Sequence, residues 1–255
     1  MSVLAVLDPA VAVAHAVVAA VAHLVPTASA IVLFTVAVRL ALHPLARAAA
    51  RGEKARARLA PKVAALQHKH RDRPEKLREA LAEMYRKEQV SPFAGCLPLL
   101  VQIPFFSVMY RLFTTPNDLL DRTLFGVPLG LHVTGAHGAG QWVVFGVLFA
   151  GLAAVGVVNF RRARRAAATA AAATAATAAT ATATATATAK TPAAKAPVPP
   201  GAGLLPYLSF GSVLFAALVP VAAVLYLLTT GVWSAAERAW LYRDGTPVPA
   251  AAMMS

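Results

Sequence analysis

The sequence has 255 residues, of which 58% are hydrophobic and only 14% are charged, and its formal net charge is +13. Soluble domains carry about 25% charged residues, so this composition excludes an ordinary soluble globular protein. The basic residues lie between the apolar runs without interleaved aromatic residues, which argues against a partner recognised by its nucleic-acid sequence. Because Cys96 is the only cysteine, a disulfide within the chain and a cysteine-based metal site are excluded as well.

The first 26 residues are mainly apolar and end at Pro26. Residues 1–25 contain Asp8 but no lysine or arginine, so they lack the basic start of a secretory signal. We interpret this segment as a helix that lies in the outer membrane interface. A further membrane span is the alternative.

Apolar runs long enough to cross a bilayer, which needs about 20 helical residues, follow along the chain. The run 27–46 contains one formal charge, Arg39, and the run 93–113 contains Pro98 and Pro104, which are expected to kink it. A third run covers 141–160. The apolar stretch near the C-terminus is too long for one span, so we expect a tight turn at Val219 and Pro220 and two short spans.

The distribution of charge orients these spans. Residues 47–90 hold 13 Lys/Arg against 6 Asp/Glu, and residues 161–203 hold 6 against none, whereas 114–140 hold 1 against 2. By the positive-inside rule, both basic loops are expected in the cytoplasm, where they also attract anionic lipids. The predicted fold is an all-α membrane protein, a five-transmembrane-helix bundle with its N-terminus outside and its C-terminus in the cytoplasm.

The predicted segments alternate between membrane spans and the connections that join them. They are an outer interfacial helix (1–26), a first span (27–46), a cytoplasmic antiparallel helical hairpin (47–92), a second span (93–113), an outer loop (114–140), a third span (141–160), a basic, Ala/Thr-rich cytoplasmic loop (161–203), a fourth span (204–218), a fifth span (219–236) and a cytoplasmic tail (237–255). We expect partial helix or disorder within the Ala/Thr-rich stretch 166–189.

The hairpin prediction rests on two amphipathic stretches, 52–68 and 75–89, separated by a break near 70–73. Their apolar positions recur at helical spacing and are Leu59, Val63, Leu66, Leu77, Leu81 and Tyr85. A docking surface for a partner or an incoming chain is one interpretation. A solvated spacer whose narrow apolar stripes bury each other is the other.

Polar residues within the spans are the candidate functional residues. An arginine inside a membrane normally faces a polar cavity or a partner, but Arg39 could also extend its side chain to the interface. Gln102, Thr229 and Thr230 could line the same recess, or could bond to a neighbouring helix or to their own backbone. No carboxylate lies within any predicted span, which argues against a proton-coupled carrier. No nucleophile with its base, metal cluster or phosphate loop is present, so no enzyme, cofactor or metal is predicted.

Three motifs stand out within and after the spans. Residues 91–113 read SPFAGCLPLLVQIPFFSVMYRLF, residues 124–130 read LFGVPLG, and Val38, Arg39 and Leu40 are followed by Pro44. These motifs resemble, in turn, the second core span, the outer loop that follows it and the first core span of the YidC/Oxa/Alb membrane protein insertases, and the actinobacterial branch of that family most. The resemblance covers roughly residues 27–242.

This resemblance implies an insertase and chaperone in the bacterial plasma (inner) membrane. It implies a groove, open to the cytoplasm and to lipid, that is lined by Arg39, Gln102, Tyr226, Thr229 and Thr230. The implied partners are nascent membrane proteins, with the Sec translocon, a ribosome or a targeting factor left open. The chain has no long basic tail after Tyr242, which leaves ribosome binding through such a tail unsupported. The alternative function is a small multi-pass transporter or channel subunit, which would need inverted repeats or an intramembrane acid.

Overall fold

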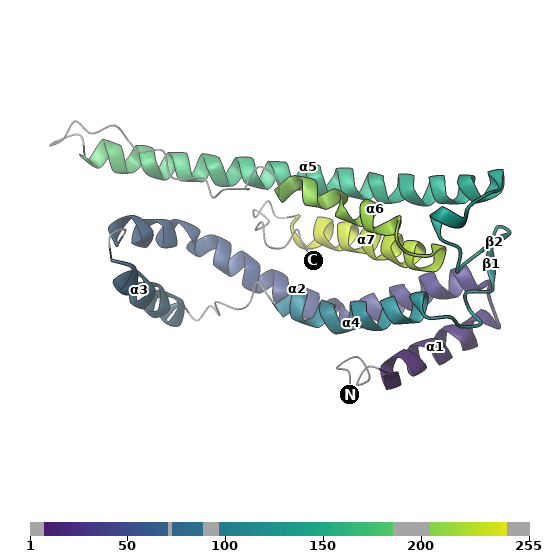
Figure 1. The fold of residues 1–255 in the computed structure, drawn as a ribbon. Coiled ribbons are helices and arrows are strands. Elements are labelled where there is room, and N and C mark those ends of the chain that lie inside the picture. The colour runs from purple at the N-terminus through teal and green to yellow at the C-terminus, as the bar shows by residue number, and fades with distance from the viewer. Residues whose placement is uncertain (1–7, 71–72, 89–96, 186–204, 244–255) are drawn as a thin grey trace.

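The computed structural model describes residues 8–70, 73–88, 97–185 and 205–243. Within these ranges the chain is almost entirely helical (Figure 1). The elements in chain order are α1 (Asp8–Ala22), α2 (Thr27–Lys69), α3 (Pro74–Lys87), α4 (Leu97–Thr114), β1 (Thr123–Leu124), β2 (Val127–Pro128), η2 (Val133–Gly135), α5 (Ala139–Ala185), η3 (Leu205–Phe210), α6 (Gly211–Ala216) and α7 (Val221–Leu241).

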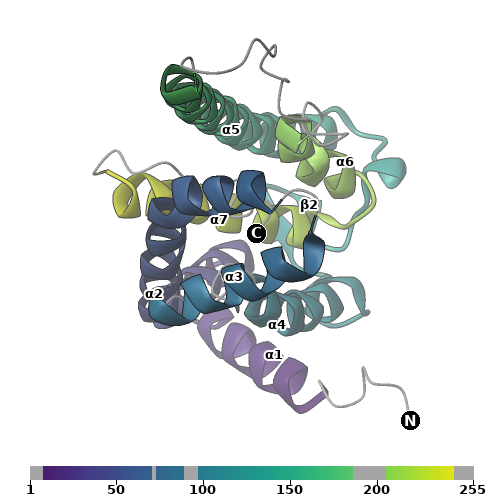
Figure 2. The same ribbon diagram turned by 90° about the vertical axis from the view of Figure 1, so that its left-hand side faces the viewer.

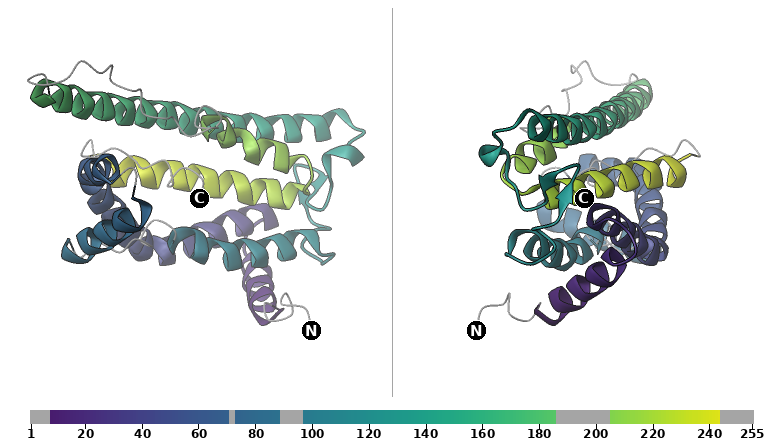
Figure 3. Two further views of the ribbon diagram at one scale, coloured as in Figure 1. Left: turned by 60° about the vertical axis from the view of Figure 1, so that its left-hand side comes forward. Right: turned by 90° about the vertical axis from the view of Figure 1, so that its right-hand side faces the viewer.

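The long helices run roughly along one axis. Figure 2 looks down this axis and shows α7 between α5 and α6 on one side and the layer of α2 and α4 on the other. The contacts agree, because α7 packs against α2, α4 and α5. Helix α1 crosses the outside of the α2 and α4 layer (Figure 3) and packs against both helices. Helix α7 is therefore the central element of the fold.

The core fills the half of the bundle near the β1–β2 hairpin. Its largest fully buried side chains come from α1, α2, α4, α5, α7 and the connecting loop, and include Val18, Ile31, Met109, Leu112, Phe113, Leu129, Phe145, Leu152 and Val224. The segment between β2 and η2 is joined to the start of α7 by two backbone hydrogen bonds. Ala222 N donates to Leu129 O at 2.9 Å, and Val221 N donates to Leu131 O at 3.0 Å. These bonds satisfy donors that a helix N-terminus leaves unpaired, and so fix the position at which α7 begins.

Two features differ from the segments expected from the sequence. The first span and the first amphipathic stretch form one helix, α2, which is 43 residues long and includes Pro44 and Pro61. The Ala- and Arg-rich sequence around residues 46–58 has high helix propensity and continues the helix. The region expected as a fourth span contains the 3₁₀ helix η3 and the six-residue helix α6, with a turn before Pro220.

Length and composition identify segments that can cross a membrane. Thr27–Gln67 in α2 and Ala139–Thr169 in α5 are long and apolar enough to do so. Helix α5 continues beyond its apolar part as far as Ala185. The high helix propensity of the many alanines there outweighs the lower propensity of the threonines. The structure thus agrees with the expected class, an all-α membrane protein.

Candidate functional site

Polar residues line one face of α7 where it packs against α2. Tyr226, Thr230, Trp233 and Glu237 follow one another at spacings of four, three and four residues, which places them on one side of a helix. On α2, Thr35, Arg39 and His43 are each four residues apart and also share a face. Because α2 and α7 pack together, these two polar stripes define the seam that we call the α2–α7 seam.

Arg39 is the central cation of this seam. Its side chain is half-buried, and its Nε atom is buried without a hydrogen-bond partner among the residues that the structure describes. Tyr226 and Glu237 of α7 lie close enough to interact with the guanidinium electrostatically. A guanidinium has five N–H donors, and the one on Nε has no acceptor among the described residues.

Two further buried polar atoms belong to the same face of α7. Thr230 Oγ1 and Trp233 Nε1 have no hydrogen-bond partner within the described ranges. Buried polar groups are normally satisfied by protein, ordered water or a ligand. Three such atoms lie on the facing helices α2 and α7, so the seam between them is not a purely apolar interface.

The other residues predicted for the groove have different surroundings. Tyr226 is buried, and its ring contacts Phe113 of α4 with the two centroids 6.0 Å apart. The hydroxyl of Thr229 donates to Leu225 O at 2.8 Å, so it bonds to its own helix, as the alternative interpretation allowed. The backbone of Gln102 belongs to α4, but its side chain lies outside the described part of the structure.

Glu237 is the functional candidate that the sequence analysis missed. Its Oε1 lies 2.5 Å from His43 Nδ1, and its side chain is only 12% exposed. Glu237 was overlooked because it stands one residue beyond the predicted end of the fifth span at 236. The helical spacing from Tyr226 to Glu237, together with the four-residue spacing from Arg39 to His43, is the signal that could have found it.

A second polar cluster joins the same two helices beyond Glu237. Glu53 of α2 is buried and accepts a hydrogen bond from the Tyr242 hydroxyl. Burial, followed by this hydrogen bond, raises the pKa of Tyr242 above its ordinary value, so the phenol stays protonated and remains a donor at neutral pH. Arg238 interacts electrostatically with both Glu53 and Tyr242. These contacts connect the end of α7 to the part of α2 that follows the predicted first span.

Basic residues and aromatic rings reinforce this second cluster. Arg47 lies over the ring of Trp240 at 5.3 Å, and Lys54 lies over the ring of Tyr242 at 5.6 Å. Cation–π contacts of this length are attractive. Arg162 of α5 donates to Ala235 O at 2.7 Å. The end of α7 is thereby held from both sides, by α2 and by α5, which fixes the seam residues that precede it.

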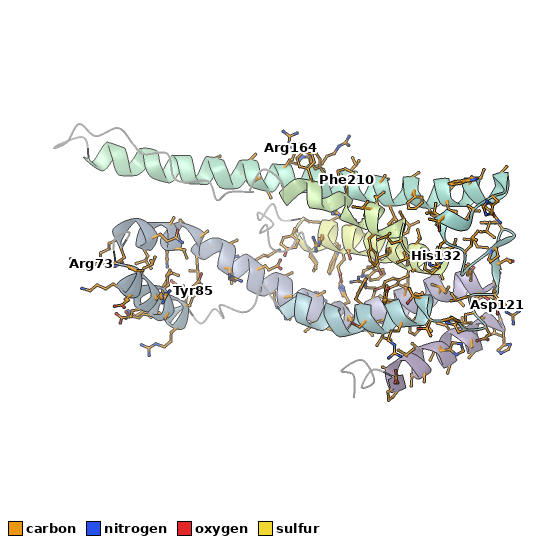
Figure 4. All side chains as sticks on the ribbon, in the orientation of Figure 1. Arg73, Tyr85, Asp121, His132, Arg164 and Phe210 are labelled. Carbon is orange, nitrogen blue, oxygen red and sulfur yellow. The ribbon has the colours of Figure 1, made fainter. Side chains whose placement is uncertain are left out.

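The apolar residues predicted for the hairpin lie on α2 and α3, which pack against each other. Leu59 is buried, at 5% exposure. The remaining five are half-buried, namely Val63, Leu66, Leu77, Leu81 and Tyr85. Lys62 of α2 pairs with Glu88, which follows α3, and Glu83 pairs with Lys87 at 2.7 Å. Figure 4 shows α3, with Arg73 and Tyr85, at the end of the molecule opposite His132 and Asp121.

Fold and seam together define an all-α integral membrane protein with a partly unsatisfied cationic seam. The family model described as 60Kd inner membrane protein matches residues 20–247. The chain therefore belongs to this family, and the membership predicted from its motifs is confirmed. It is an inner membrane protein.

Curated relatives carry the name membrane protein insertase YidC. The relative from Caulobacter vibrioides (strain NA1000 / CB15N) is 36% identical over 97 residues, which are 38% of this chain and 16% of the relative. The one from Polynucleobacter asymbioticus is 40% identical over 80 residues, 31% of this chain and 14% of the relative. The one from Pelagibacter ubique is 44% identical over 97 residues, 38% of this chain and 17% of the relative. The matches thus span about a sixth of the length of these relatives.

Proposed function

We propose that this protein is a membrane protein insertase and chaperone, not an enzyme, which moves hydrophobic segments of nascent proteins from the cytoplasm into the bilayer. The observation that carries the proposal is the α2–α7 seam, where Arg39 Nε, Thr230 Oγ1 and Trp233 Nε1 are buried without partners among the described residues. The names of the relatives support the same activity.

The seam explains physically how such an insertase lowers the barrier to insertion. A charge or an unpaired backbone group costs several kcal/mol in hydrocarbon. A translocated tail that follows the seam can exchange its water for the guanidinium of Arg39 and the hydroxyls of Tyr226 and Thr230. Its hydrophobic segment meanwhile faces lipid. Gln102 of α4 and Thr229 are further proposed lining residues.

The proposed topology has five spans, with the N-terminus outside and the C-terminus in the cytoplasm. The excess of Lys/Arg in 47–90 and 161–203 supports it. In this arrangement the α2–α3 hairpin lies in the cytoplasm, where its half-buried apolar stripe can receive a nascent chain. Proposed partners are nascent membrane proteins and anionic lipids, with the Sec translocon, a ribosome or a targeting factor as cytoplasmic or lateral partners.

Complementation tests the function directly. Expression of the full chain in bacteria depleted of their own insertase is expected to restore insertion of a small membrane protein that does not need the Sec translocon, measured by protection of its translocated tail against protease. A cytoplasmic reporter with normal synthesis in the same cells is the control. Stable, membrane-integrated protein that leaves the tail unprotected would disprove the insertase proposal.

Protease added from outside intact spheroplasts tests the topology. We expect the Ala/Thr-rich stretch to remain uncut, because the excess of basic residues in 161–203 retains this loop on the cytoplasmic side. After lysis the same stretch should be cut. Cleavage before lysis would reverse the proposed orientation.

A further inference from the structure

Glu237 has cationic neighbours on two helices. His43 of α2 lies 2.5 Å away, and Arg39 of α2 interacts with it electrostatically, as does Arg238 of its own helix. A carboxylate that is 12% exposed is stable in its ionised form only where such groups compensate for its lost hydration. The short contact is a hydrogen bond between the Glu237 carboxyl group and the His43 imidazole, which holds the carboxyl group in place.

The carboxylate compensates the charge of Arg39 without occupying all its donors. Glu237 acts on the guanidinium through its charge, while Arg39 Nε retains no hydrogen-bond partner among the described residues. The seam therefore offers an entering chain both a cation with donors to fill and, about one helical turn further along α2, a carboxylate held by His43. An acidic group can bind the former, and a basic group can approach the latter.

We propose that Glu237, positioned by His43, is the counter-charge of Arg39 and sets the charge selectivity of the seam, so that translocated tails with either acidic or basic residues are accepted. This inference rests on the proposed insertase function and specifies its substrate class. Without Glu237, Arg39 becomes an uncompensated cation that attracts acidic tails more strongly and repels basic ones. The predicted specificity is therefore a property of the pair, and not of the arginine alone.

The test compares single-span substrates that differ only in the tail, which carries aspartates, lysines or serines. Tail protection is measured for each in cells that contain the full chain as their only insertase. In Glu237→Gln, the ratio of acidic-tail to basic-tail insertion is expected to rise about fivefold, the factor for one pair of unit charges roughly 4 Å apart that are screened as in bulk water. Glu237→Asp retains the charge and should retain the ratio of the parent protein.

Asp121→Asn is the matched control, because it removes the same charge from an exposed position just before β1, at the end of the molecule opposite Arg73 (Figure 4). It should leave the ratio unchanged. If Glu237→Gln only folds less well, insertion of all three substrates falls by the same factor and the ratio does not change. Such a uniform loss would mean that Glu237 is only structural, and would overturn the inference. A ratio within twofold of the parent value overturns it as well.

A double variant tests whether Glu237 acts through Arg39. Removing both charges, in Arg39→Gln with Glu237→Gln, should return the acidic-to-basic ratio toward one, because the uncompensated cation is then absent. If the ratio stays as high as in Glu237→Gln alone, Glu237 does not act through Arg39. The proposed insertase function is disproved by a different result, in which none of the three tails is protected from protease in cells that contain the parent protein.

Discussion

Replacing Arg39 with alanine is expected to lower the insertion of a substrate with an acidic translocated tail by about tenfold or more. Charge-assisted hydrogen bonds contribute roughly 1.5–3 kcal/mol each, and about 1.4 kcal/mol corresponds to a factor of ten. The partly unfilled guanidinium in the α2–α7 seam is the group that would supply this free energy. The measurement is protease protection of the tail in cells depleted of their own insertase.

Arg51→Ala is the matched control for this prediction. Arg51 belongs to the same helix and is exposed, so its removal changes the net charge equally without touching the seam. Arg39→Lys should fall between the parent and Arg39→Ala, because lysine retains the charge but loses the planar set of donors. Equal insertion by Arg39→Ala and Arg51→Ala would show that Arg39 only extends its side chain to the interface.

The sequence could predict the membrane class and the family because both depend on local information. Apolar runs of bilayer length and the contrast in charge between loops are visible without any tertiary contact. The motif from Ser91 to Phe113 identifies the family although part of it lies outside the described residues. Arg39 is visible for the same reason, as the one formal charge within the apolar run 27–46.

The partners of Arg39 could not be predicted in this way, because they depend on how α2 and α7 pack. Glu237 lies about 200 residues away along the chain and just beyond an apolar run, so no local pattern connects it to His43. Thr229 and Thr230 are neighbours in sequence, yet one bonds to Leu225 O and the other presents an unpartnered hydroxyl among the described residues. Only the rotation of α7 about its axis distinguishes the two.

The lengths of the helices were also hard to predict, because the apolar pattern that marks a membrane span does not mark where its helix ends. The sequence indicates where an apolar stretch ends, but a helix ends only where its backbone hydrogen bonds stop. Alanine-rich sequence therefore carries α2 to Lys69 and α5 to Ala185. Near the C-terminus the opposite holds, because the apolar residues before Pro220 form η3 and α6, and not one long helix.

Gly156→Leu is expected to destabilise the protein by about 1–3 kcal/mol, the usual cost of overpacking a close interface. Gly156 is buried in α5, where an added Cβ would lie 3.1 Å from Phe210 Cδ1 and 3.2 Å from the backbone oxygen of Ser209. The backbone oxygen cannot rotate away as a side chain could. Glycine here lets η3 approach α5 closely, as small residues do between membrane helices.

Gly146→Leu separates this steric effect from helix propensity. Gly146 lies in the same helix, is exposed, and has no atom within 4 Å of an added Cβ. Both substitutions gain about the same helix propensity, up to roughly 1 kcal/mol, so their difference reports the contact with η3. Thermal unfolding of the two variants in the same detergent gives that difference. Equal unfolding temperatures would mean that η3 moves away from α5 without cost, and that the packing seen at Gly156 contributes nothing to holding the segment before α7 in place.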